Sequence, residues 1–472
     1  MYRNGVLPSG EPITALVARD GPIVSTQFSC ESCHGRSGMG AAEGDYVVPS
    51  VAAQFLFAES PQPARPAYDK DSLAKLLREG VTPSGRVLPP QLMPRYQLAD
   101  ADVDTLLAYL ETLSPGDSPG VNDSTIRFAV IVTDEPDTAE RDAVVAVVRR
   151  FAEDINRQTR NDGERWDRGY TPESKLPTVF REWAIDEWVL SGAPSTWRGQ
   201  LERYYGDAPV FAAVGGLGES TWAPVSEFCE RNKLPCLYPS TDLPYRGGED
   251  FYTVYFSRGL LLEADLIANH LSESPPPAVV QVYCDADLVP ATTALHRQLT
   301  DEGIPVETAA VDCAAPLPTI ADDAAVVLWF DRAGLDAMAG EIPTERVYVS
   351  STLLGRNPGD IKSRGDVFAA HPYRLPGAAD PAYKRFEVWA NTRGVPITNP
   401  HRQAEAWFAT LVIRDAVKHM GRFRVREFAL DMMDHAENLG AYVPGYPRPS
   451  FGPGQRFINK GGYILTVIDG EP

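Results

Sequence analysis

The sequence predicts a multidomain protein in which a small all-α domain precedes a two-lobed α/β domain. Helical patterns at 71–79 and 99–113 occur in the first 113 residues, and a turn-rich stretch, S-P-G-D-S-P-G at 114–120, follows them. From residue 125 onward, short apolar runs alternate with amphipathic stretches, and this alternation restarts near residue 252. Such alternation is typical of parallel sheets covered by helices. We therefore expect domains at 1–116 and 125–472, joined by a linker at 117–124.

Composition narrows the classes of function. The chain has 472 residues, 43% of them hydrophobic, which suits a globular protein of two or three domains. Its net charge of -20 argues against nucleic acid, whose phosphates need a basic surface. No run of 18 apolar residues occurs, so we expect no transmembrane helix in this chain.

The most informative motif is C-E-S-C-H at residues 30–34. This pattern is typical of covalent attachment of one haem c, in which Cys30 and Cys33 form thioethers and His34 binds the iron. The alternatives are a redox C-x-x-C pair or half of a zinc site. A zinc site needs further Cys or His nearby, and the next hundred-odd residues contain none.

Met93, in L-M-P-R-Y, is the expected second axial ligand. A thioether is a soft iron ligand, and His/Met ligation suits electron transfer. Met39 is too close to His34 to reach the opposite face of the ring, and no histidine lies between His34 and His270. The alternative is that Met93 is an ordinary core methionine.

Residues 27–113 resemble a class I cytochrome c domain. The resemblance rests on the early C-x-x-C-H, the late M-P, and a closing helix that ends L-L-A-Y-L at 106–110. It implies a small helical fold with an exposed haem edge. Haem c attachment implies the periplasm, so we expect that a signal peptide or anchor has been removed, because 1–20 has no apolar core segment. The acidic surface suits docking to a basic redox partner, a dehydrogenase or another cytochrome.

Within these domains the pattern predicts individual elements. Helices are expected at 71–79, ending at Gly80, and at 99–113. In the following half we expect strands at 126–132, 183–190, 209–214 and 236–238, and helices at 138–156, 196–205 and 223–231. In the remaining part we expect strands at 252–256, 278–283, 306–311, 324–330, 346–350 and 462–468, and helices at 260–271, 292–302 and 404–420. The stretch 367–373 leads back towards the first lobe.

The stretch 125–469 resembles a type I periplasmic binding protein, of the Leu/Ile/Val or amide kind that serves ABC transporters. The resemblance rests on the order of elements, on the block 210–239, and on the F-G-P-G-Q near the end. It places lobe 1 at about 125–250 and 385–472, and lobe 2 at about 251–384. The charged, Pro-containing segment 161–177 departs from the family, which usually runs straight into its second strand.

The family resemblance implies a small polar solute, such as an amino acid or amide, bound between the lobes. In that family a Ser or Thr hydroxyl and backbone N–H groups hold the carboxylate, and an acidic group holds the amine. The nearest counterparts here are Ser220, Thr221, Ser257 and Asp285. The alternative for each is an ordinary loop or helix-cap residue.

The other four cysteines fit an oxidising compartment. Cys229 and Cys236 flank a short Pro-containing segment, and Cys284 and Cys313 each end an apolar strand pattern. Adjacent parallel strands would bring those two ends together, so we expect disulfides Cys229–Cys236 and Cys284–Cys313. The alternative is four buried free thiols.

Three functional hypotheses follow. The first is one-electron transfer, with the second domain recognising a solute or the redox partner. The second is a solute-binding or sensing protein whose haem reports redox state, and the third is an enzyme that uses the haem as an electron sink. The sequence has no G-x-S-x-G or H-E-x-x-H motif, so we expect an electron carrier or binding protein rather than an enzyme.

Overall fold

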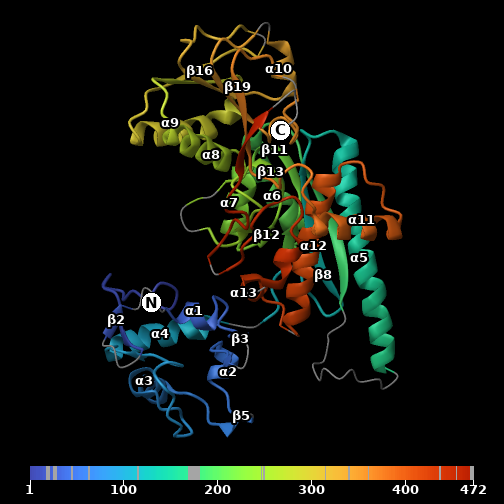
Figure 1. The fold of residues 1–472 in the computed structure, drawn as a ribbon. Coiled ribbons are helices and arrows are strands. Elements are labelled where there is room, and N and C mark those ends of the chain that lie inside the picture. Colours follow the sequence, from blue (N-terminus) through green and yellow to red (C-terminus); the bar gives the residue numbers. More distant parts are fainter. Residues whose placement is uncertain are drawn as a thin grey trace. The chain divides into compact units, whose positions relative to one another are not determined.

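The protein forms two compact units, each described here by itself (Figure 1). The computed structural model describes residues 1–17, 22–24, 29–43, 46–61, 64–113, 116–167, 181–245, 247, 250–313, 315–338, 341–359, 361–421, 423–434, 437–452 and 454–467. Residues 114–115 of the turn-rich stretch, much of the segment 161–177, and Pro453 of F-G-P-G-Q lie outside these residues. In the described part, no helix is long and apolar enough to cross a membrane.

The first unit contains the C-x-x-C-H motif and mixes helices with short strands. Its helices in the first 122 residues are α1 Cys30–His34, α2 Ala53–Leu56, α3 Lys70–Glu79 and α4 Asp100–Thr112. Its strands are β1 Thr14–Leu16, β2 Pro22–Val24, β3 Ala41–Glu43, β4 Tyr46–Val48, β5 Ser60–Pro61, β6 Ala64–Arg65 and β7 Arg95–Tyr96. The expectation of an all-α domain therefore needs correction, because the segments between the helices pair as β2-β1-β7 and as two small hairpins.

The two longer helices of this unit form as their sequence predicts. Asp69 accepts a hydrogen bond from the Ser72 N–H at the start of α3, and Gly80 ends the helix with a φ of 74°. The buried leucines of α3 pack against the buried face of α4 in one apolar cluster. That cluster includes Leu73, Leu76, Leu77, Val103, Leu106 and Leu110.

The first unit also includes a segment from the far end of the sequence, Arg414–His435. This segment contains α13 Arg426–Asp434, most of whose residues are buried. The Phe423 ring packs edge-on against Phe55, with 5.3 Å between ring centroids. The haem-motif unit is thus built from two distant parts of the chain, which the expected boundary at residue 116 did not anticipate.

The second unit begins with a parallel seven-stranded sheet. Its path is β13-β11-β8-β10-β12-β14, and β9 also pairs with β8. The strands are β8 Thr125–Thr133, β9 Glu182–Leu190, β10 Ala212–Val214, β11 Leu217–Thr221, β12 Cys236–Leu237, β13 Ser240–Leu243 and β14 Thr253–Val254. The associated helices are α5 Thr138–Asp167, η2 Pro194–Thr196, α6 Trp197–Asp207, α7 Ala223–Arg231, α11 Pro381–Arg393, α12 Pro400–His419 and η4 Glu437–Tyr442.

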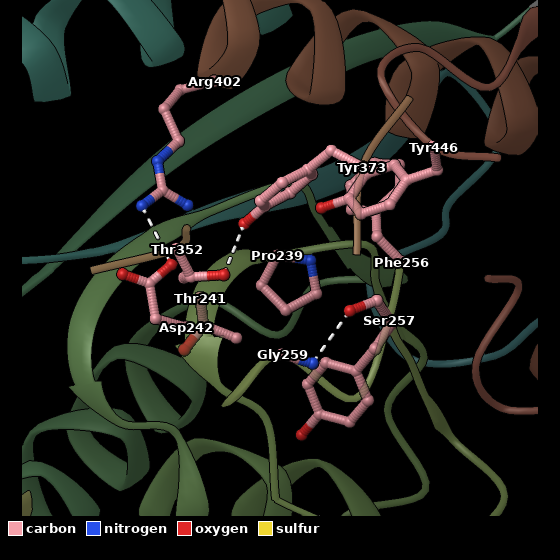
Figure 2. A pocket seen from close by; sticks show the side chains of 11 residues that line it. Pro239, Thr241, Asp242, Phe256, Ser257, Gly259, Thr352, Tyr373, Arg402 and Tyr446 are labelled. Atoms are coloured by element: carbon pink, nitrogen blue, oxygen red, sulfur yellow. Dashed lines mark hydrogen bonds and ion pairs between the residues drawn. The ribbon is translucent and has the colours of Figure 1, made fainter. Parts of the chain in front are cut away.

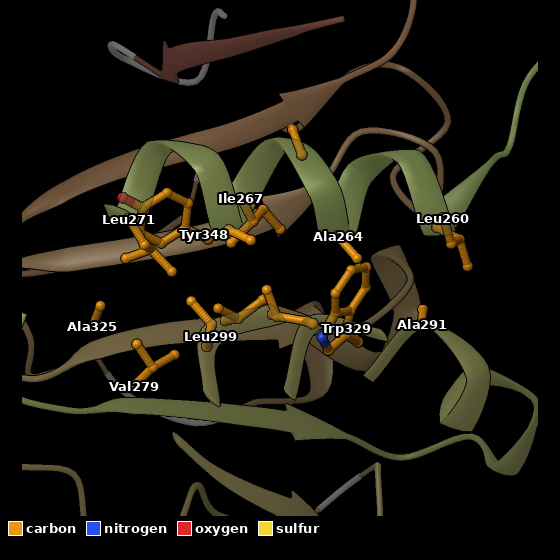
Figure 3. Packing of buried hydrophobic residues seen from close by; sticks show 14 of the residues in the cluster. Leu260, Ala264, Ile267, Leu271, Val279, Ala291, Leu299, Ala325, Trp329 and Tyr348 are labelled. Carbon is orange, nitrogen blue, oxygen red and sulfur yellow. The ribbon is translucent and has the colours of Figure 1, made fainter. Parts of the chain in front are cut away.

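A six-stranded sheet, β16-β15-β17-β18-β19-β20, forms the second lobe. Its strands are β15 Val279–Tyr283, β16 Val306–Ala310, β17 Ala325–Trp329, β18 Arg346–Ser350, β19 Asp366–His371 and β20 Tyr463–Val467. Its helices are α8 Leu260–Glu273, η3 Ala286–Leu288, α9 Val289–Asp301 and α10 Arg332–Ala337. Helices α8 and α9 cover one face, where Ile267, Leu299 and Trp329 pack into a continuous core (Figure 3).

Two details of the lobes differ from expectation. Strand β20 pairs antiparallel with β19, so the end of the chain belongs to the second sheet rather than to lobe 1. Strand β14 pairs with β12, so it closes the first sheet instead of opening lobe 2. The chain therefore crosses to the second lobe only after residue 254. Its last described strand, β20, belongs to the second sheet.

Both expected disulfides are present. Cys229 and Cys236 join α7 to β12, with Cα atoms 6.2 Å apart. Cys284 and Cys313 are joined with Cα atoms 5.0 Å apart, just beyond the parallel neighbours β15 and β16. The second bond fastens an edge strand to the rest of its sheet.

Candidate functional site

The C-x-x-C-H motif lies on the short helix α1. The Ser29 hydroxyl caps this helix by accepting a hydrogen bond from the Ser32 N–H. His34 is buried, and its Nδ1–H donates to the Pro49 carbonyl at 2.9 Å. That bond fixes the ring and leaves Nε2 as the nitrogen able to bind a metal. Burial lowers the pKa of His34, which favours the neutral imidazole that metals bind.

The thiols and thioether needed for haem c are also in suitable surroundings. All six cysteines lie in the described part of the chain, and only Cys30 and Cys33 are outside disulfides. Cys30 and Met93 pack against the same apolar cluster, and Cys33 is exposed. An apolar environment with a thiol at its edge, a buried imidazole and a thioether fits a covalently attached haem.

Asp431 of α13 holds the chain immediately after the motif. Its two carboxylate oxygens accept the backbone N–H groups of Arg36 and Ser37, each at 3.0 Å, and Asp431 is 7% exposed. Gly35 has a φ of 72°, and a Cβ there would come within 2.6 Å of the Asp431 carboxylate. Glycine at position 35 therefore permits both the turn and the close approach of Asp431.

A second candidate site is a pocket between the two lobes of the second unit, at the carboxyl ends of strands from both sheets (Figure 2). The residues that line it are Pro239, Thr241, Asp242, Tyr255, Phe256, Ser257, Gly259, Thr352, Tyr373, Arg402 and Tyr446. Aromatic rings and polar groups alternate around it, which is typical of a small-molecule pocket.

Two buried ion pairs lie in and behind this pocket. Arg402 is 3.2 Å from Asp242, the pair drawn in Figure 2. Arg356 donates to Glu405 at 2.8 Å, and the Glu405 side chain is only 2% exposed. Burial opposes the charge of Glu405, but the two arginines outweigh it and lower the pKa of the carboxyl. The Arg356–Glu405 pair is therefore ionised.

Glu263 is a further buried carboxyl beside the pocket wall. Its Oε1 accepts the Thr352 N–H at 3.0 Å and the Thr352 hydroxyl at 2.7 Å. Its Oε2 is buried without a hydrogen-bond partner among the described residues. Burial raises the pKa of Glu263 to about 8. The group is consequently largely protonated at neutral pH.

The backbone groups expected to hold a ligand carboxylate are already occupied. Glu135 Oε2 accepts the N–H groups of Glu219 and Ser220, each at 3.1 Å, and the Thr133 hydroxyl at 2.9 Å. An internal carboxylate thus occupies these two N–H groups beside Ser220, one of the predicted ligand residues.

Of the four predicted ligand residues, only Ser257 lines the pocket. Ser220 lies beside Glu135, the Thr221 hydroxyl accepts the Ala223 N–H, and Asp285 caps η3 by accepting the Asp287 N–H. Thr221 and Asp285 thus make the contacts of ordinary loop and helix-cap residues, which was the alternative to a role in ligand binding.

Sequence reasoning missed four charged residues in and around this pocket, namely Glu263, Arg356, Arg402 and Glu405. No local motif marks them, because their partners lie far away in the sequence. The Ser240 hydroxyl, for example, donates to Glu405 across 165 positions. The one available signal was the position of Asp242 at the end of an expected strand.

Comparison with known protein families gives one match in the first part of the chain. Residues 19–114 match the model of the cytochrome c family. A search of curated proteins gave no match.

Solved structures similar to the chain are two-lobed binding proteins. One is a substrate-binding periplasmic protein from Ralstonia solanacearum, with TM-score 0.49, 14% identity, and coverage of 73% of this chain and 98% of that one. Another is a branched-chain amino acid ABC transporter protein from Thermus thermophilus with bound valine, with TM-score 0.48, 10% identity, and coverage of 74% and 95%. A third is a fatty acid substrate-binding protein from Thermomonospora curvata, with TM-score 0.47, 15% identity, and coverage of 75% and 92%.

Proposed function

We propose that this chain is a periplasmic electron carrier with one haem c. Cys30 and Cys33 would form the thioethers, and His34 and Met93 would be the axial iron ligands. The haem supplies a one-electron couple when bound. The protein supplies attachment, ligand geometry and an acidic surface for a basic dehydrogenase or cytochrome partner.

The observation that carries this proposal is the state of His34. The imidazole is buried, is oriented by the Pro49 carbonyl through Nδ1, and presents Nε2 as its metal-binding nitrogen. A redox C-x-x-C pair needs no such oriented histidine beside its second thiol. Saturation of the iron by a second ligand, Met93, would favour electron transfer over the binding of small gases.

The second unit would give the carrier its specificity. Its two sheets meet at a pocket lined by aromatic and polar residues, an arrangement suited to recognising a small solute. The second candidate function, a solute sensor with a redox-reporting haem, is favoured by this pocket. In either case the binding-protein-like domain recognises a solute or partner, and the haem domain transfers an electron or reports the redox state.

The test is an absorption spectrum of the full chain expressed in the periplasm, oxidised and reduced, beside the Met93→Ala variant. We expect sharp reduced α and β bands and a weak far-red methionine–iron band that the substitution removes. Met39→Ala is the matched control, since Met39 lies in the same unit, and it should keep that band.

A spectrum unchanged by Met93→Ala, or a high-spin spectrum of the unmodified protein, would contradict the Met93 assignment. A high-spin iron would also favour catalysis or gas sensing over electron transfer.

A further inference from the structure

The Arg356 side chain is enclosed as a bound cation would be. Its guanidinium donates to Glu405 at 2.8 Å and lies 3.8 Å from the centroid of the Tyr373 ring. The Tyr446 ring is 5.8 Å away. A carboxylate combined with aromatic faces is a common way in which proteins recognise guanidinium and ammonium ions.

The acidic member of this enclosure is itself firmly held. Glu405 accepts hydrogen bonds from the Ser240 hydroxyl and, at 3.0 Å, from the Tyr446 hydroxyl. With Arg356 it therefore has three partners, although it is almost fully buried. We call Glu405, Tyr373 and Tyr446 the cation cage.

Arg356 reaches Glu405 from the opposite lobe. It follows β18 in the second sheet, whereas Glu405 belongs to α12, whose Ala406 lies against Gly215 of the first lobe. The Arg356 backbone has a φ of 70°, which is unfavourable for a residue with a side chain. The contacts with the cage compensate for this backbone conformation and link the two lobes.

The surroundings favour a cation without a carboxylate. The N–H groups of Glu219 and Ser220 are occupied by Glu135, and Arg402 is paired with Asp242. Neither the two N–H groups nor Arg402 is therefore left free to bind a ligand carboxylate.

We propose that Arg356 is an internal ligand and that the cation cage recognises small solutes bearing a guanidinium or amine group. This inference rests on the proposed role of the cleft as a recognition site and names its ligand class. An external cation would have to displace Arg356, which is tethered at high effective concentration. The apparent affinity of the unmodified protein for such a solute therefore equals the affinity of the free cage multiplied by the fraction of molecules in which Arg356 has left it.

Chemical rescue tests this directly on the full chain. Arg356→Ala should lower the melting temperature, and millimolar methylguanidinium, far below denaturing concentrations, should restore part of the loss. Calorimetric titration should give methylguanidinium at least tenfold tighter apparent binding to this variant than to the unmodified protein. Urea, which is similar in shape but uncharged, should give no rescue.

Arg364→Ala is the matched control, because Arg364 forms an exposed ion pair with Asp322 in the same lobe. It should show no response to methylguanidinium. Adding Glu405→Gln to Arg356→Ala should abolish the rescue. If Arg356→Ala does not fold, Arg356→Met keeps the apolar stem and serves in the same titration.

Three outcomes would refute the proposal that the cage binds cations. They are equal responses of the Arg356 and Arg364 variants to methylguanidinium, equal rescue by urea, and rescue that survives Glu405→Gln. The haem spectrum is read independently of this titration. Loss of the methionine–iron assignment would therefore refute the proposed electron carrier without touching the cage, and the reverse also holds.

Discussion

At the scale of single residues, Glu263 should make stability depend on pH. Burial raises its folded pKa to about 8, above its ordinary value of 4.5, so the folded protein holds a proton that the unfolded chain releases. The resulting stabilisation is complete below about pH 4.5 and is lost as pH rises towards 8. The slope attributable to one group is at most about 1.4 kcal/mol per pH unit.

Glu263→Gln should remove this part of the slope between pH 5 and 8, measured by chemical denaturation at several pH values. Glu307→Gln is the matched control, because Glu307 is exposed on the edge strand β16. A slope that is the same in both variants would show that Glu263 titrates normally.

Asp431 should stabilise the unit that carries the haem motif. Its carboxylate is the acceptor for two backbone N–H groups that directly follow the motif. Asp431→Ala would leave those groups without their acceptor, and we expect a loss of about 1–3 kcal/mol in the free energy of unfolding. Denaturation followed through haem absorbance measures it, with the exposed Asp322→Ala as control. Equal stability of the two variants would mean that water replaces the carboxylate without cost.

At the scale of elements, the buried parallel strands were predictable, because strands covered on both faces are continuous apolar runs. Strand β17, A-V-V-L-W, is fully buried and lies within its expected range. Strands β11 and β13 were missed because their sequences, L-G-E-S-T and S-T-D-L, contain few apolar residues. Strand β13 contributes Thr241 and Asp242 to the pocket, so an element that is hard to predict helps to build it.

The same physical difference separates the two candidate sites. The haem motif is local, since attachment chemistry fixes the spacing of five consecutive residues, and a sequence therefore displays it. The cation cage joins positions 373, 405 and 446, and only tertiary packing brings them together around Arg356. Asp431, 394 positions from Ser37, is equally invisible in a sequence.

At the scale of the whole molecule, the haem-motif unit should depend on the distant end of the chain. Phe423 packs on Phe55, the Arg424 carbonyl accepts the Ser118 N–H at 2.8 Å, and Asp431 holds the loop after the motif. All three partners come from the segment Arg414–His435, which belongs to the same compact unit. We therefore expect that the cytochrome-like part needs the segment Arg414–His435 for its full stability.

A chain of residues 1–122 should consequently melt at a lower temperature than the haem unit of the full protein. Each 1 kcal/mol lost lowers the melting temperature of a domain of this size by about 4–8 °C. Haem absorbance followed on heating measures the difference, and joining residues 414–435 to the short chain should restore much of it. If the short chain melts at the same temperature as the full protein, the contacts of the distant segment add no stability. If it melts earlier, the closing segment of the binding-protein-like domain is also a structural part of the haem unit, which gives a physical reason for the two to be fused in one chain.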